Sequence, residues 1–148
     1  PRVKMSQDQI AIDFYDRDSL TTILSELVCG FGLLPFIAWF ISSGSVVAFI
    51  VFFNGILFHI FFPNSFFMKT FDICCNAVLV ILINIFAWNL IVVYLTCFSV
   101  VCFVINSTSG VKSVSKSLVH VIGVQGPLFL ALIIAEAKNP YVVLKYKP

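Results

Sequence analysis

Charged side chains are scarce in this sequence: only 11% of its 148 residues are Asp, Glu, Lys or Arg, whereas 60% are hydrophobic. A typical soluble domain is about one-quarter charged. With so little polar surface the chain could not cover its apolar residues in water, so we expect the lipid bilayer to be its main solvent. The net charge of +2 and the lack of a basic run exclude nucleic acid as an expected partner.

The cysteine pattern also lacks the features of a covalent framework. The number of cysteines is odd, no CxxC occurs, and all five fall in apolar segments: Cys29, Cys74, Cys75, Cys97 and Cys102. A disulfide scaffold or a zinc ribbon is therefore not expected. We interpret these residues as small buried side chains, with palmitoylation of Cys74 or Cys75 as the alternative.

Long apolar runs are what the sequence has in abundance, and they predict an all-α, polytopic integral membrane helix bundle. The first run, residues 20–41, would reach about 33 Å as a helix, which is enough to cross a bilayer. The bundle as a whole covers residues 20–137, between a polar N-terminal arm (1–19) and a basic C-terminal tail (138–148). We expect five transmembrane helices: 20–41, 45–62, 67–84, 89–105 and 117–137.

The number of spans depends on residues 71–105, in which only Asp72 is charged. One straight helix of this length would measure about 52 Å, against a hydrocarbon core of about 30 Å. We therefore expect a turn within residues 84–89, with Trp88 at the membrane interface. No glycine or proline marks that turn, so four spans, with a single long helix over 71–105, remain the alternative.

The distribution of lysine and arginine predicts a cytosolic N-terminus. With five spans, the N-terminal side carries six basic residues and the opposite side carries the three lysines of the tail. With four spans the division is seven against two. Both counts satisfy the positive-inside rule in the same orientation.

Proline, glycine and asparagine residues inside the spans predict local features of the helices. Pro35 should kink the first span, and Gly126 and Pro127 should kink or break the last one. A transporter's discontinuous helix is the alternative interpretation of the latter pair. Four asparagines are expected to join helices through amide hydrogen bonds: Asn54, Asn76, Asn84 and Asn89.

Four ionisable residues share one predicted depth in the cytosolic leaflet. His59 lies just before the end of its span and Asp72 just after the start of the next, about 5 to 8 Å below the rim. Glu26 lies at about 9 Å, and His120 joins the group only if residues 71–105 cross twice. We expect a His59–Asp72 hydrogen bond of structural value. The alternative is a zinc site, because two imidazoles and two carboxylates are a sufficient ligand set.

The order of His59 and Asp72 resembles the membrane hydrolase superfamily of alkaline ceramidases, adiponectin receptors and hemolysin-III proteins. The resemblance covers the Leu-Phe-His59 and Phe-Asp72 strings, and Glu26 is similar to an acidic residue in the ceramidases' first span. It implies a zinc-dependent lipid hydrolase. The sequence departs from the family pattern at Gly55, where the family has serine, and at Gln125, where a second histidine would be expected near His120.

The string from Asn54 to Asn76, together with the 17 phenylalanines, also resembles small multi-span proteins encoded by large DNA viruses. Some proteins of that class lie in the membrane inside the capsid, so this resemblance implies a virion membrane protein.

Together these features predict a non-enzymatic structural or assembly component of a membrane, without a cofactor. We expect it to belong to a larger assembly and to bind protein partners through residues 1–19 and 138–148. The zinc-dependent lipid hydrolase is the alternative, and a small transporter or channel subunit is the third reading.

Overall fold

The structure is a computed structural model that describes residues 20–108 and 113–138, and every regular element in these ranges is helical. The predicted all-α fold is therefore confirmed. The N-terminal arm, part of the loop after residue 108, and residues 139–148 of the tail lie outside the described residues.

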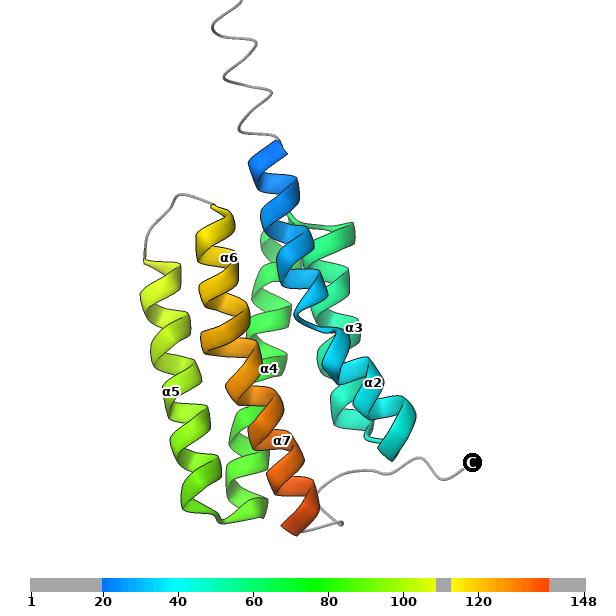
Figure 1. Ribbon diagram of the computed structural model, residues 1–148, viewed down its shortest axis with the longest axis vertical. Coiled ribbons are helices and arrows are strands. Elements are labelled where there is room, and N and C mark those ends of the chain that lie inside the picture. Colours follow the sequence, from blue (N-terminus) through cyan, green and yellow to red (C-terminus); the bar gives the residue numbers. More distant parts are fainter. Residues whose placement is uncertain (1–19, 109–112, 139–148) are drawn as a thin grey trace, which may run out of the picture.

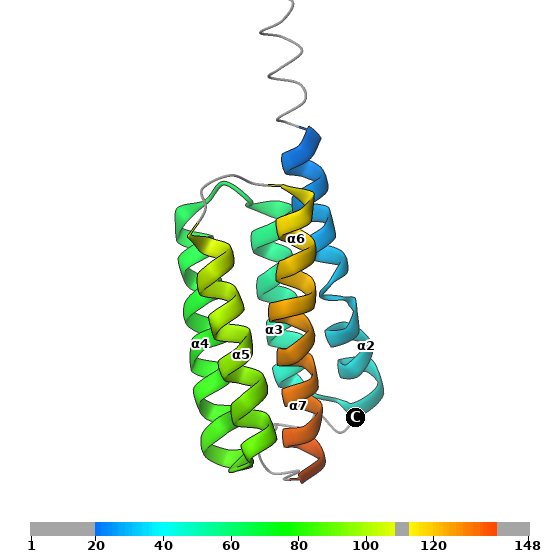
Figure 2. The ribbon, with the colours of Figure 1, turned by 60° about the vertical axis from the view of Figure 1, so that its left-hand side comes forward.

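Five helical rods run alternately up and down the bundle (Figure 1). The first combines a helix over residues 20–31 with α2 (Leu34–Ser43), and the second combines α3 (Val46–Ile56) with the π-helix η1 (Leu57–Phe61). The third and fourth are α4 (Phe66–Ala87) and α5 (Leu90–Ser107). The fifth contains α6 (Val114–His120), the π-helix η2 (Val121–Gln125) and α7 (Gly126–Lys138). Figure 2 shows α4 and α5 along one flank and α2 along the other, with α3 and α7 between them.

Four of the rods are long and apolar enough to cross a membrane: Leu20–Ser43, Phe66–Ala87, Leu90–Ser107 and Val114–Lys138. The remaining rod, Val46–Phe61, is apolar but shorter. Large apolar side chains also cover the outside of the bundle, for example Phe66, which is 83% exposed, and Leu90, which is 87% exposed. Such a surface requires lipid, so the protein is a multi-pass integral membrane protein.

The split of residues 71–105 follows the five-helix prediction. Helix α4 ends at Ala87, three residues beyond the predicted end of its span, and Trp88 adopts a left-handed conformation with φ of 41°. Asn89 then caps α5, because its side-chain oxygen accepts a hydrogen bond from the Ile91 N–H at 2.8 Å. The turn thus reverses the chain without glycine or proline, and the single long helix of the four-span alternative was wrong.

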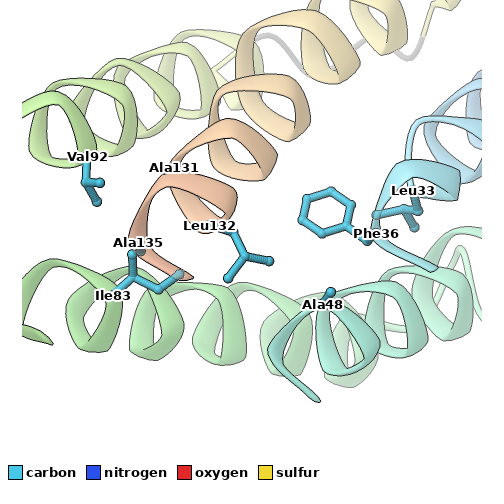
Figure 3. Close-up of a cluster of buried hydrophobic side chains, with 8 residues drawn as sticks. All are labelled: Leu33, Phe36, Ala48, Ile83, Val92, Ala131, Leu132 and Ala135. Carbon is cyan, nitrogen blue, oxygen red and sulfur yellow. The ribbon is translucent and has the colours of Figure 1, made fainter. Parts of the chain in front are cut away.

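The apolar core occupies the half of the bundle that contains this turn. Side chains from α2, α3, α4, α5 and α7 meet there, as Figure 3 shows: Leu33, Phe36, Ala48, Ile83, Val92, Ala131, Leu132 and Ala135. Small alanines on α3 and α7 allow the helices to approach closely. The Phe36 ring packs edge-on against Phe129, with ring centroids 5.1 Å apart. This core holds the last rod against its neighbours.

The cysteines correct one sequence expectation. Cys29 is buried as predicted, and Cys75 and Cys102 are partly buried. Cys74 and Cys97 are instead exposed on the outer, apolar surface of the bundle. In a membrane protein such positions face lipid, where a cysteine is tolerated as a small apolar side chain.

The cap at Asn89 gives a first prediction. We expect Asn89→Ala to lower the free energy of unfolding by about 1 kcal/mol, because the first turn of α5 loses its side-chain acceptor. Asn89→Ser should stay near the parent's stability, since a hydroxyl can still cap the helix. The serine substitution also removes the buried Nδ2 of Asn89, which has no hydrogen-bond partner within the described residues. Thermal unfolding in a mild detergent, followed by circular dichroism, measures both variants. Equal losses in the two would contradict the capping role.

Candidate functional site

The candidate site lies at the end of the bundle that contains the start of the first helix, the turn between η1 and α4, and the start of α6 (Figure 1). Glu26, His59, Asp72 and His120 all lie in the parts of their helices nearest this end. Because residues 71–105 form two antiparallel helices, the last rod starts on the same side as the first. This arrangement is the one in which His120 was predicted to lie at the depth of the other three residues.

The closest polar contact in the site joins Glu26 to His59. The Nδ1 atom of His59 lies 2.7 Å from the Oε2 atom of Glu26, and both side chains are buried. His59 belongs to the π-helix η1, and π-helical insertions often occur at functional sites because they change the direction of a side chain. A buried carboxylate paired with an imidazole satisfies two groups that are costly to place in a bilayer.

Asp72 has a different partner from the one predicted. The Nδ2 atom of Asn76, one turn later in α4, donates a hydrogen bond of 3.1 Å to Asp72 Oδ1. Among residues 20–108 and 113–138, no hydrogen bond joins His59 to Asp72. Glu26 takes the place predicted for Asp72 because the first helix packs directly against η1, where Gly30 lies close to Ile60.

His120 completes the group from the other side of the bundle. Its ring centroid lies 6.0 Å from that of His59 and 6.3 Å from that of Phe103. A cavity of about 440 Å³ lies between these helices, and six of its lining residues carry polar side chains: His59, Asp72, Asn76, Ser99, His120 and Gln125. The rest of its wall is mainly apolar, so the cavity has a polar part in an otherwise hydrophobic chamber.

The zinc site formed by Glu26, His59, Asp72 and His120 remains a prediction. Zinc requires several ligands at about 2.0 to 2.2 Å from one point. Within the part of the chain that the structure describes, no three His, Cys, Asp or Glu side chains are grouped closely enough to hold a metal ion. His59 also uses Nδ1 for its contact with Glu26, which leaves only Nε2 as a donor atom. The predicted ligands share a neighbourhood without forming a coordination sphere.

Breaks in two helices adjoin the site, close to the prolines that predicted kinks. The first rod breaks at Gly32 and Leu33, just before Pro35, and the Leu33 N–H donates to Gly30 O instead of to Cys29 O. Gln125 compensates, because its Nε2 donates to Cys29 O at 3.1 Å.

The last rod is irregular where Gly126 and Pro127 follow the π-helix η2. There, Ser99 of α5 donates to the Val124 carbonyl at 2.9 Å. Polar side chains from neighbouring helices thus donate to backbone carbonyls in both irregular segments. These carbonyls need such donors because the hydrocarbon core contains no water. Sequence reasoning did not identify Ser99; a lone serine in an apolar run is a weak signal.

Three of the four asparagines form side-chain hydrogen bonds within the described residues, each with a different role. Asn84 of α4 joins two helices as predicted, through a hydrogen bond of 2.9 Å to Thr96 of α5. Asn76 bonds within its own helix and Asn89 caps α5, so neither provides the predicted link between helices in the described residues. Asn54 is buried in α3, and the described residues give its side chain no hydrogen bond.

A second buried carboxylate, Glu136, lies at the opposite end of the bundle and was missed by the sequence analysis. Trp39 donates its indole N–H to Glu136 Oε2 at 2.9 Å, and Ser45 donates to the other carboxylate oxygen. Ser45 also caps α3 by accepting from the Ala48 N–H at 3.1 Å. Glu136 of α7 therefore forms hydrogen bonds to both α2 and the α2–α3 turn. Its position two residues before the end of the last rod was the available signal.

Comparison of the chain with models of known protein families, with curated proteins and with solved structures gives no match.

The Glu26–His59 contact gives a second prediction. We expect a double-mutant cycle of Glu26→Ala and His59→Ala to give a coupling energy of about 1 kcal/mol in favour of the pair, since intramembrane hydrogen bonds have about this strength. The matched control is the cycle of Asp72→Ala and His59→Ala, which should give a much smaller coupling because no hydrogen bond joins these two. Unfolding in mixed micelles measures all the variants. Equal couplings in the two cycles would show that the contact with Glu26 has no special role.

Proposed function

We propose that the protein is a non-enzymatic structural or assembly component of a membrane, whose helical bundle serves as a rigid anchor for a soluble layer. The observation that supports this proposal is that polar side chains inside the bundle form hydrogen bonds between helices. They join helices to one another, as in the pairs Glu26–His59, Trp39–Glu136, Asn84–Thr96 and Gln125–Cys29.

These pairs support an anchoring role for a physical reason. Hydrogen bonds between membrane helices fix which faces pack together, because separated polar groups would find no water in hydrocarbon. Contacts of this kind lie at both ends of the bundle, with Glu26 at one and Glu136 at the other. In the proposed role, these hydrogen bonds hold the bundle in a defined shape.

The partner-binding parts in this proposal are the polar segments at the two ends of the bundle. Residues 1–19 carry four aspartates and three basic residues, and residues 138–148 carry three lysines. Few apolar side chains are present in the arm to pack it alone, so a partner would have to order it. The resemblance to proteins of large DNA viruses extends the proposal to the inner membrane of a virion, where the partner would be a capsid layer.

The orientation gives a third prediction. With a cytosolic N-terminus, a cysteine at Ser113 should react with an impermeant reagent from the cytosolic side, and one at Ser42 from the opposite side. Ser113 caps the start of α6 and Ser42 is near the end of α2, and these two helix ends lie at opposite ends of the bundle (Figure 1). Both substitutions are made in a variant whose native cysteines are replaced by alanine, with that variant as the control. Labelling of both positions from the same side would contradict the antiparallel arrangement, and an exchange of the two sides would reverse the orientation.

The alternative is a zinc-dependent membrane lipid hydrolase, and one observation favours it. His59, Asp72 and His120 line the same cavity, in which a lipid-soluble molecule could be held. The absence of three grouped ligands among the described residues weighs against this alternative.

One experiment separates the two functions, and it gives a fourth prediction. The full chain is purified from its membrane with a mild detergent after chemical cross-linking, and zinc is measured in the same sample. We expect cross-links from residues 1–19 to a soluble protein layer, lost when residues 1–18 are deleted, and no stoichiometric zinc. The His59→Ala variant should leave these cross-links unchanged.

Stoichiometric zinc that is lost in the His59→Ala variant, together with lipid hydrolysis, would replace the structural proposal with the hydrolase. A chain that yields no cross-links from either end would also overturn the anchoring role.

A further inference from the structure

Two hollows lie on opposite sides of the Gln125 side chain. One is the cavity of about 440 Å³ that His59, Asp72 and His120 line, and its wall also includes lipid-exposed side chains of α4 and α5: Ile81, Val100 and Val104. The other is a groove of about 420 Å³ on the outside, lined among others by Phe31, Gly32, Pro35, Leu118 and Gln125. Phe31 is 66% exposed and Leu118 is 48% exposed, so this groove opens towards lipid. Gln125 is the residue that lines both hollows.

Gln125 occupies the narrow space between the first and the last rod. Its Nε2 donates to Cys29 O across the two rods, and its side chain packs so closely on Gly32 that a Cβ there would come within 1.9 Å of Oε1. The segments on either side are irregular: the first rod breaks at Gly32 and Leu33, and the last rod is π-helical up to Gln125. Irregular segments of this kind often mark hinges, so this partition is a place where the wall can open.

Two acceptor oxygens beside the cavity have no donor within the described residues. Gln125 Oε1 is buried, and the described residues provide no hydrogen bond to it. Asp72 receives one hydrogen bond, on Oδ1, and within the described ranges none reaches its other oxygen. An acceptor left without a partner in a bilayer is costly, because no bulk water replaces the missing donor. A ligand that carried N–H or O–H groups at one end would supply what these oxygens lack.

The size of the cavity limits the ligand further. At roughly 30 Å³ for a water or a methylene group, the cavity holds about fifteen non-hydrogen atoms. A single hydrocarbon chain of about a dozen carbons with a small head would fill it, whereas a two-chain phospholipid would not fit. The mainly apolar wall suits the chain, and the part near Asp72 suits the head.

We propose that a single-chain amphipathic molecule with a hydrogen-bond-donating head, an amine or an alcohol, enters this cavity from the bilayer through the groove at Gly32 and Gln125. The Gln125 side chain closes the entrance by its hydrogen bond to Cys29 O, and it swings aside when the ligand passes. In the cavity the head donates to Asp72 and the chain lies along the apolar wall. This binding is independent of the anchoring role of the terminal segments.

The test uses the full chain in lipid nanodiscs and three probes that differ only in the head: dodecylamine, dodecanol and dodecanoic acid, each with a photoreactive group in the middle of the chain. After illumination, the labelled peptides are identified by mass spectrometry. We expect the amine and the alcohol to label cavity residues on α4 and α5, such as Val80 and Phe103, and the acid to label them weakly. Ala77→Leu, which narrows the cavity, should reduce this labelling.

The entrance is tested by the rate of labelling. Gln125→Ala removes the hydrogen bond that closes the partition, so the amine should label the cavity about fivefold faster than in the parent chain. The matched control is Gly30→Ala, on the helix that Gln125 contacts, where the added Cβ would meet the flexible end of Ile60 and neither hollow. Its rate should equal that of the parent. Size-exclusion chromatography checks that each variant is folded.

If Gln125→Ala does not fold, Gly32→Ala provides the second measurement, because its Cβ would displace Oε1 and change the rate while Gly30→Ala does not. Labels found only on the lipid-facing surface, or equal labelling of the cavity by the acid, would overturn the proposed ligand. Equal rates in the Gln125, Gly32 and Gly30 variants would overturn the proposed entrance.

Discussion

A carbonyl released from a helix inside a bilayer has no water to bind, and the site described above depends on how one such carbonyl is satisfied. The Leu33 N–H turns to Gly30 O, and the Cys29 carbonyl receives Gln125 Nε2 from the last rod instead. This hydrogen bond brings the first rod against the last, because Gly32 leaves room for the glutamine. The contact of Glu26 with His59 depends on the same placement of the first rod. A local irregularity of the backbone thus determines which side chains can meet.

The two ends of the bundle use buried carboxylates in different ways. Glu136 accepts from an indole and a hydroxyl and lies beside the tightly packed apolar core. Glu26 pairs with an imidazole and lies near a cavity whose wall contains further polar groups. The carboxylate of Glu136 thus lies beside packed side chains, whereas that of Glu26 lies near space that a ligand could occupy.

The fold could be predicted from the sequence to the extent that it follows from apolar length. The run over 71–105 was too long for one crossing, and that alone placed His120 on the side of His59. The form of the turn could not be predicted, because Trp88 in a left-handed conformation is uncommon for a large residue. The partner of His59 could not be predicted from the sequence either. The turn between spans two and three brings Asp72 near His59, but it does not determine which face of the first helix packs against His59. Glu136 was overlooked because its partners, Trp39 of α2 and Ser45 of the α2–α3 turn, are distant in the chain.

The brevity of the α4–α5 connection has a consequence for biogenesis. Only Trp88 and Asn89 separate the two helices, and the polar atoms of Asn89 are largely occupied by or buried against α5. During insertion, therefore, almost no hydrated loop has to be moved across the hydrocarbon. Helices α4 and α5 can enter the membrane together as a preformed hairpin, with the indole of Trp88, 89% exposed, leading towards the far interface, where it is well solvated.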